Sequence, residues 1–168
     1  EIVDTYTHDG KYYLFSRLNK ETYFQKIEIK KERALNLATD YMASAEKDIS
    51  TESFQYLKKA LDEITPFMDY SLYAEYPIGS GKKINIPSAI HILANKINDR
   101  IMLIGDREEI NIAIGINKNH VIHISCIDKI TKEPLNNITL EAKMDGNNIT
   151  KSAITNENGE AKIHLFKI

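Results

Sequence analysis

The string GSGKK at residues 79–83 is the stretch of this chain whose residue types most suggest chemistry, because glycine-rich loops that end in lysine cradle phosphate groups. The phosphate-loop motif needs a glycine five residues before its last glycine, and Tyr76 stands there. It also needs a serine or threonine after the lysine to hold magnesium, and Lys83 occupies that place. We therefore predict a surface loop over Tyr76–Pro87 and no nucleotide or other cofactor.

The histidines and the cysteine are the next candidates for metal binding or nucleophilic chemistry. His120 and His123 lie in a predicted strand. Residues three apart in a strand point to opposite faces, so these two cannot both hold one metal ion without a bulge. Cys126 shares a strand face with Ile122 and Ile124, which we expect to be buried. A buried thiol behaves as a small hydrophobe, so the sequence predicts neither a metal site nor a catalytic cysteine.

Carboxylates on the predicted helices could in principle form a hydrolase site. Such a site needs two acids that converge in one cleft and have different environments. Most of the helical acids instead lie among lysines, as they do on solvated helix faces. These acids are Glu28, Glu32, Asp40, Glu46, Asp62 and Glu63. We therefore predict no catalytic residue and no enzymatic activity.

Three tyrosines beside the GSGKK string form the one candidate site that the sequence offers. Tyr70, Tyr73 and Tyr76 are spaced by three, and Lys82 and Lys83 follow them. Tyrosine suits contact surfaces because its ring is rigid and amphipathic. These five residues are therefore a possible interaction surface. The interpretation that we favour is that the tyrosines only pack a helix end onto its neighbour.

The elements that must position these residues change period near Gly105. Residues 1–18 read as a β-hairpin around the turn Asp9-Gly10, with aromatic residues on both strand faces. Apolar residues then recur every three or four positions. This spacing predicts a long helix from Asn19 to about Ile49 and a second helix from Asp48 or Ser50 to about Leu72, broken near Thr65 by Pro66. The two helices should form an antiparallel hairpin.

A third helix is predicted from Pro87 or Ser88 to Ile104, with Gly105 as its C-terminal cap. From Ile110 onward, apolar residues alternate between turns rich in Gly, Asn and Asp. Five short strands of this kind indicate an antiparallel sandwich or a small barrel. The fold class is therefore α+β, with a hairpin and helical module at 1–104 and a β module at 105–168. No Gly/Ser linker separates them, so we expect a fixed angle.

Composition excludes several partners. The chain has 168 residues, a net charge of −2 and 27% charged residues. This balance gives no reason to expect nucleic acid or an anionic membrane surface as a partner. The sequence contains no run of eighteen apolar residues, so no transmembrane helix is expected. Because Glu1 is not an initiator methionine, we expect the chain to be a mature or trimmed piece of something longer.

The opening segment IVDTYTHDGKYYLFSRLNKETYFQKI resembles the closing part of the LPP-twenty-type bacterial lipoprotein domain. In that family an aromatic-rich strand, a turn and a strand similar to YYLFSRLNK run into a long helix rich in Ala, Glu and Lys. The resemblance covers about the first 45 residues. The earlier helix and strands of that domain, and its lipidated cysteine, have no counterpart in this chain.

The C-terminal segment is similar to bacterial immunoglobulin-like domains of cell-surface proteins. Residues 134–138 (PLNNI) look like the entry of those domains to a strand, and residues 155–161 (TNENGEA) look like their Thr-x-x-x-Gly-x-Ala turn. The resemblance covers about Ile110 to Ile168 and implies an antiparallel immunoglobulin-like β-sandwich. Neither resemblance brings a catalytic residue with it.

Together the resemblances imply a non-enzymatic protein of the bacterial cell envelope, periplasmic or associated with the outer membrane. Its role would be structural or in protein interaction, with other envelope proteins as partners. Contact with a membrane would run only through a lipid anchor upstream of Glu1. The alternative is a module that binds a glycan or a peptide on the aromatic surface near Tyr70, Tyr73 and Tyr76. Burial of all three tyrosines would exclude that alternative.

Overall fold

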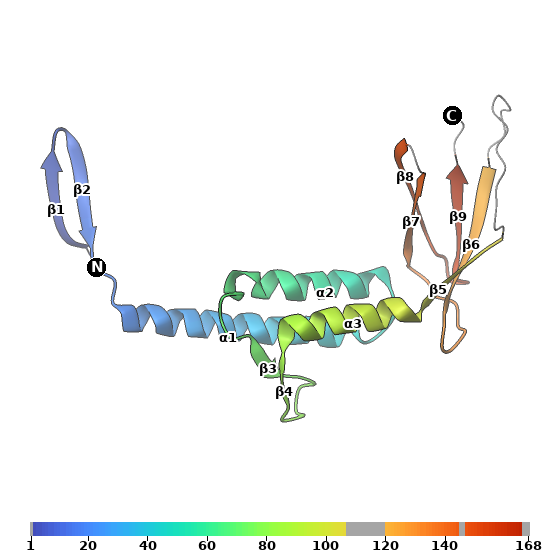
Figure 1. Ribbon diagram of the computed structural model, residues 1–168, viewed down its shortest axis with the longest axis horizontal. Helices are drawn as coiled ribbons and strands as arrows, with labels where there is room; N and C mark the ends of the chain where they lie inside the picture. Colours follow the sequence, from blue (N-terminus) through green and yellow to red (C-terminus); the bar gives the residue numbers. More distant parts are fainter. Residues whose placement is uncertain (1, 107–119, 145–146, 166–168) are drawn as a thin grey trace.

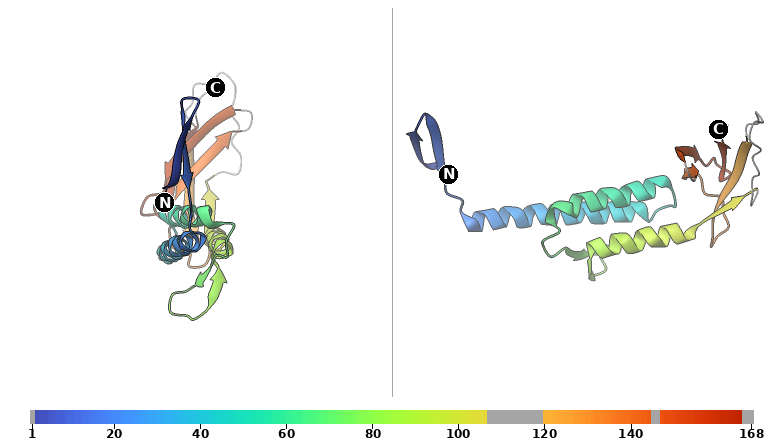
Figure 2. Two further views of the ribbon diagram at one scale, coloured as in Figure 1. Left: turned by 90° about the vertical axis from the view of Figure 1, so that its left-hand side faces the viewer. Right: turned by 45° about the horizontal axis from the view of Figure 1, so that its top comes forward.

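The computed structural model describes residues 2–106, 120–144 and 147–165, and it has an elongated α+β fold (Figure 1). A β-hairpin stands at one end, three helices form the middle, and small antiparallel sheets form the other end. The right-hand view of Figure 2 shows the same order of parts along the long axis of the molecule from another direction. This arrangement agrees with the predicted α+β class at the level of its elements.

The N-terminal hairpin forms as predicted. Strands β1 (Ile2–His8) and β2 (Lys11–Ser16) pair antiparallel, with His8 opposite Lys11. Asp9 and Gly10 form the turn between them with positive φ angles of 47° and 69°. Asp and Gly tolerate this backbone region better than other residues, which is why the dipeptide marked the turn. Within the described residues, the hairpin forms a sheet of two strands.

The long first helix, α1 (Lys20–Ala45), begins where its cap predicts. The side-chain oxygen of Asn19 accepts a hydrogen bond from the Thr22 amide at 3.2 Å. Its 26 residues correspond to about 39 Å at 1.5 Å per residue. The helix ends before Ile49, earlier than the apolar spacing predicts.

The local reason is the polar turn that opens the second helix, α2 (Thr51–Ile64). The carboxylate of Asp48 accepts hydrogen bonds from the hydroxyls of Ser50 and Ser53 at 3.1 and 2.8 Å. Ser50 caps the helix by accepting from the Ser53 amide. Such side chains compete with the helical backbone, so α1 stops and α2 starts after the Ser50 cap. Helices α1 and α2 then lie side by side, as the predicted helical hairpin requires (Figure 1).

The second helix ends at Ile64, so its predicted continuation to Leu72 is wrong. The break falls where Pro66 removes a backbone donor, and a short 3-10 helix, η1 (Thr65–Phe67), follows. The residues after it include a two-stranded sheet of β3 (Tyr73–Glu75) and β4 (Lys83–Asn85). The predicted loop over Tyr76–Pro87 therefore contains a strand and the start of the third helix.

The third helix, α3 (Ile86–Arg100), starts under an Asn85 cap that accepts from the Ser88 amide at 3.0 Å. It ends at Arg100, so the predicted helical end at Ile104 with a Gly105 cap is wrong. Residues Ile101–Gly105 form strand β5 and pair with β6 (His120–Asp128). The segment is apolar at four consecutive positions, which fits a strand as well as a helix, and the partner strand decides between them.

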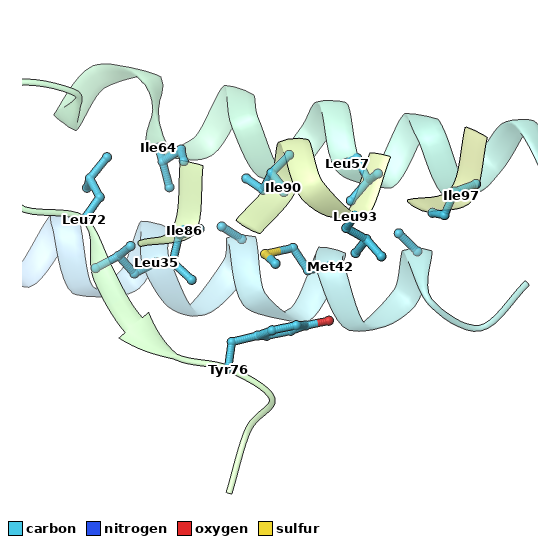
Figure 3. Packing of buried hydrophobic residues seen from close by; sticks show 13 residues of the cluster. Leu35, Met42, Leu57, Ile64, Leu72, Tyr76, Ile86, Ile90, Leu93 and Ile97 are labelled. Atoms are coloured by element: carbon cyan, nitrogen blue, oxygen red, sulfur yellow. The ribbon is translucent and has the colours of Figure 1, made fainter. Parts of the chain in front are cut away.

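The main hydrophobic core lies between the three helices (Figure 3). Its members come from the predicted apolar stripes and from the connection between α2 and β3, which contributes Leu72. Its largest buried side chains include Leu35, Met42, Leu57, Ile64, Leu72, Ile86, Ile90, Leu93 and Ile97. All three helices therefore depend on one shared core.

The β part contains a sheet of order β5-β6-β9 and a separate pair, β7-β8. Strand β9 spans Glu160–Leu165, β7 spans Thr139–Met144 and β8 spans Asn147–Ile154. Cys126, Ile138, Leu140 and Ile163 belong to a second core. The described residues show no closed sandwich, and the predicted first strand, at 110–116, lies outside them.

The helical and β parts contact one another directly. Thr51 at the start of α2 exchanges hydrogen bonds with the backbone of Asn137 and Thr139, and Arg100 at the end of α3 accepts one from the Lys129 amide. Ile49 packs against both hydrophobic cores. These contacts hold the two parts together where α3 passes into β5. The module boundary at 104/105 and the fixed angle remain predictions.

Candidate functional site

The five residues of the predicted interaction surface do not all lie on one surface. Tyr73 and Tyr70 are exposed, with 56% and 38% of their surface accessible, and Lys82 and Lys83 are exposed as well. Tyr76 is only 8% exposed and lies against α1 (Figure 3). The reason is the end of α2 at Ile64, after which a spacing of three no longer places residues on one helix face.

Tyr76 has a structural role. Its hydroxyl donates a hydrogen bond of 2.7 Å to the Glu46 carboxylate at the end of α1. Burial and this neighbouring carboxylate raise the pKa of the Tyr76 hydroxyl well above its ordinary value. The phenol therefore stays protonated and acts as a donor that ties the β3–β4 region to α1. The burial of Tyr76 against α1 is consistent with tyrosines that pack a helix end onto its neighbour.

Side-chain hydrogen bonds from within and just before the GSGKK string close this loop. The Glu75 carboxylate accepts a hydrogen bond from the Gly81 amide at 2.6 Å, and the Ser80 hydroxyl accepts one from the Lys82 amide at 3.2 Å. A phosphate-binding loop needs such amides to point at the ligand. Here an anionic side chain already takes one of them, which agrees with the prediction of a surface loop.

Cys126 is completely buried in the β part, as its strand face predicted. Burial raises the pKa of this thiol above its ordinary value, so the reactive thiolate is disfavoured. Among the residues whose placement is described, no three His, Cys, Asp or Glu side chains come close enough together to hold a metal ion.

A cavity of about 490 Å³ lies at the joint between the helical and β parts. Ala45, Leu93 and Ile97 are among its apolar lining residues, and Lys96 and Glu133 are among its charged ones. Sequence reasoning did not find this cavity, because it forms between segments that are far apart in the chain. No periodic pattern links those segments.

An ion pair between Arg100 and Asp128 borders this cavity. Asp128 is only 3% exposed, and its carboxylate also accepts a hydrogen bond from the Ile130 amide at 2.8 Å. The hydrogen bond from Arg100, followed by that from Ile130, lowers the pKa of Asp128 to about 2. Asp128 is therefore a fixed anion that joins α3 to the β part, and it is poorly suited to donate or accept a proton near neutral pH.

The Asp128 carboxylate makes the free energy of unfolding depend on pH in the acid range. Its pKa is lower in the folded chain, so its contribution is present above its ordinary value of 3.8 and is lost as the pH falls through about 2. We expect Asp128→Asn to unfold at a lower urea concentration than the parent at neutral pH. The gap between the two urea midpoints should close between about pH 4 and pH 2. Urea denaturation across this range measures the gap. Glu133→Gln, at an exposed carboxylate of the same cavity, is the control, and a gap that does not vary with pH would contradict the assignment.

The largest group of exposed apolar side chains lies at the other end of the molecule. We define the arm as the β1–β2 hairpin together with residues 20–33 of α1, which extend beyond the other two helices (Figure 1). Within the described residues, nine of the twenty large hydrophobic side chains that are exposed lie between Tyr6 and Ile29, so the apolar surface is concentrated there.

On the helical half of the arm, the core stripe of α1 continues past the point where α2 and α3 cover it. Leu35, Ala38 and Met42 are buried in the core, whereas Phe24 on the same face is 56% exposed. Lys31 interrupts the stripe, and its ammonium group forms an ion pair of 2.6 Å with Glu28. The stripe therefore has the pattern of a contact face but lacks a covering element among the residues described.

On the hairpin half of the arm, aromatic rings stack without being covered. Tyr6 lies parallel to Tyr13 with ring centroids 4.8 Å apart, and it also stacks on Phe15 at 5.9 Å. All three rings are exposed, as is Tyr12 on the opposite face. A two-stranded hairpin is only marginally stable alone in water, so these faces are suited to further contacts.

No family model, curated protein or solved structure matches this chain. The resemblances to a lipoprotein domain and to immunoglobulin-like domains therefore stay predictions. No described helix combines the length and the apolar character needed to cross a membrane.

Proposed function

We propose that this chain is a non-enzymatic protein of the bacterial cell envelope, periplasmic or associated with the outer membrane, which uses its arm to bind other envelope proteins. The exposed apolar surface of the arm is the single observation that carries the proposal. The location rests on the sequence resemblances. The three-helix core and the joint serve to hold the arm and the β part apart on one elongated scaffold (Figure 2).

The shape of the arm favours a protein partner over a small ligand. Small molecules bind in concave sites that enclose most of their surface. The arm instead presents aromatic rings on a projecting hairpin and a stripe on an extended helix. Aromatic residues are enriched at protein interfaces, and exposed apolar patches of this kind mark interaction sites.

A glycan or peptide site at Tyr70, Tyr73 and Tyr76 has less support. Tyr76 is buried and is occupied by its hydrogen bond to Glu46. The remaining two tyrosines are exposed, but the cavity at the joint is lined by other residues. The arm therefore remains the better candidate for the functional surface.

Photocrosslinking in the bacterium that encodes the chain tests this proposal. A photoreactive phenylalanine analogue at Phe24 should give covalent adducts of defined size with envelope proteins, because this side chain lies on the uncovered stripe. The same analogue at Ile92 is the matched control, since Ile92 is 68% exposed on α3, outside the arm. Equal adducts from both positions, or a chain found only in the cytosolic fraction, would contradict the proposal.

A further inference from the structure

The outer edge of strand β1 carries a pattern that the docking of another envelope protein does not explain. Sheet β1-β2 has two strands only, so β1 has no second neighbour among the described parts of the chain. A two-residue turn places His8 opposite Lys11, and the backbone groups of alternate residues, Thr5 and Thr7, then point away from β2. In agreement, the Thr5 amide donates to the Asp4 carboxylate at 2.8 Å, and pairing with a second strand would replace this local bond.

The residues along this edge read nearly the same in both directions. The order is Asp4-Thr5-Tyr6-Thr7-His8, with Tyr6 at its centre. If two such strands pair antiparallel around a two-fold axis at Tyr6, the two Tyr6 residues face each other and Thr5 faces Thr7 of the second copy. Asp4 then faces His8 of the second copy, and the two-fold axis repeats this pair on the other side of Tyr6. Aromatic, threonine and acid–imidazole pairs are all favourable across strands.

The opposite edge of the hairpin lacks this complementarity. Strand β2 carries Lys11 at its start, and Arg17 follows its last residue. Antiparallel self-pairing of β2 around Leu14 would place Lys11 opposite Arg17 of the second copy. Like charges directly opposite one another destabilise a strand pair. In this register, the charges therefore favour self-pairing through β1 over self-pairing through β2.

We propose that β1 is a homodimerisation edge, at which two copies of this chain form one four-stranded antiparallel sheet in the order β2-β1-β1-β2. This goes beyond the proposed function, because the occupant of the edge is a second copy and the surface is distinct from the stripe at Phe24. Pairing supplies the third and fourth strands that an isolated hairpin lacks. On one face it extends the stack of Tyr6, Tyr13 and Phe15 into a continuous strip of six rings.

Disulfide trapping of the full chain tests the register. Residues in a non-hydrogen-bonded antiparallel pair have Cα atoms about 4.5 Å apart, within the range of a disulfide. Tyr6→Cys should therefore give a covalent dimer under mild oxidation. Cys126 is fully buried and does not compete. Tyr12→Cys, more exposed but on β2, is the control and should give no covalent dimer. Equal crosslinking of both variants would indicate random collision and overturn the proposal.

A charge exchange tests the same contact without crosslinking. His8→Glu places two carboxylates opposite each other and should weaken the dimer about tenfold in sedimentation equilibrium. Adding Asp4→Arg to that variant restores opposite charges and should recover the affinity. A parent chain that stays monomeric at the highest concentrations reached would overturn the proposal. So would a dimer that neither His8→Glu nor Tyr6→Cys affects, since a different surface would then hold it.

Discussion

Gly159→Ala is expected to lower the free energy of unfolding of the β part by about 3–6 kcal/mol, since the added methyl group combines backbone strain with overpacking. Gly159 has a φ angle of +71°, a region that favours glycine. A Cβ atom there would lie 2.4 Å from the backbone oxygen of Cys126 and 3.1 Å from the Leu135 nitrogen.

The backbone around Gly159 has no room to move away. The Cys126 amide donates to the Gly159 oxygen at 2.7 Å, and the Leu135 amide donates to the Cys126 oxygen at 2.9 Å. Any shift of the Cys126 carbonyl that relieves the clash therefore weakens one of these bonds. The turn at 155–161 connects three chain segments through this contact, which gives its glycine a packing role as well as a conformational one.

Gly81→Ala is the matched control, because its φ angle of +67° is nearly the same while open space surrounds the added Cβ. It should cost only the strain of the left-handed region, about 1–2 kcal/mol. Urea denaturation followed by circular dichroism compares the two variants. If both cost the same, the contact with Cys126 has no energetic effect and the argument fails.

The sequence predicts elements well where one local interaction decides the outcome. Asn19 caps α1 and Ser50 caps α2 because each side-chain oxygen reaches an amide three residues on. The Asp9-Gly10 turn follows from the backbone preferences of its two residues. At the turn after Thr155, the Asn156 side chain accepts from the Asn158 and Glu160 amides, as its residue types indicate.

Prediction fails where two distant segments decide the outcome. Residues Ile101–Gly105 form a strand because β6 pairs with them, which the apolar run alone cannot reveal. The Arg100–Asp128 ion pair and its cavity depend on the same pairing. The spacing of three between Tyr73 and Tyr76 fits one helix face, whereas α2 ends at Ile64 and the Tyr76 hydroxyl bonds to Glu46 instead. The exposure of the arm follows from the length of α1 relative to its neighbours, which periodicity does not encode.

Ile64→Ala is expected to destabilise the helical part by about 2–5 kcal/mol, because it removes three buried carbons and leaves a cavity. Ile64 is completely buried at the end of α2, in the core shared by all three helices (Figure 3). Rigid neighbours, including Leu72 and Ile86, limit how far the site can collapse.

Ile92→Ala is the control for Ile64→Ala, since it makes the same chemical change on the exposed face of α3. Alanine has the higher helix propensity, so this variant should change stability by less than about 0.5 kcal/mol and in the stabilising direction. Urea denaturation with equal slopes for the two variants gives the comparison. Because the core holds α1 in place, Ile64→Ala should also lower the temperature above which the photocrosslinked adducts at Phe24 are lost. Similar costs for the two variants would mean that the core does not unite the helices, and that the arm does not depend on it.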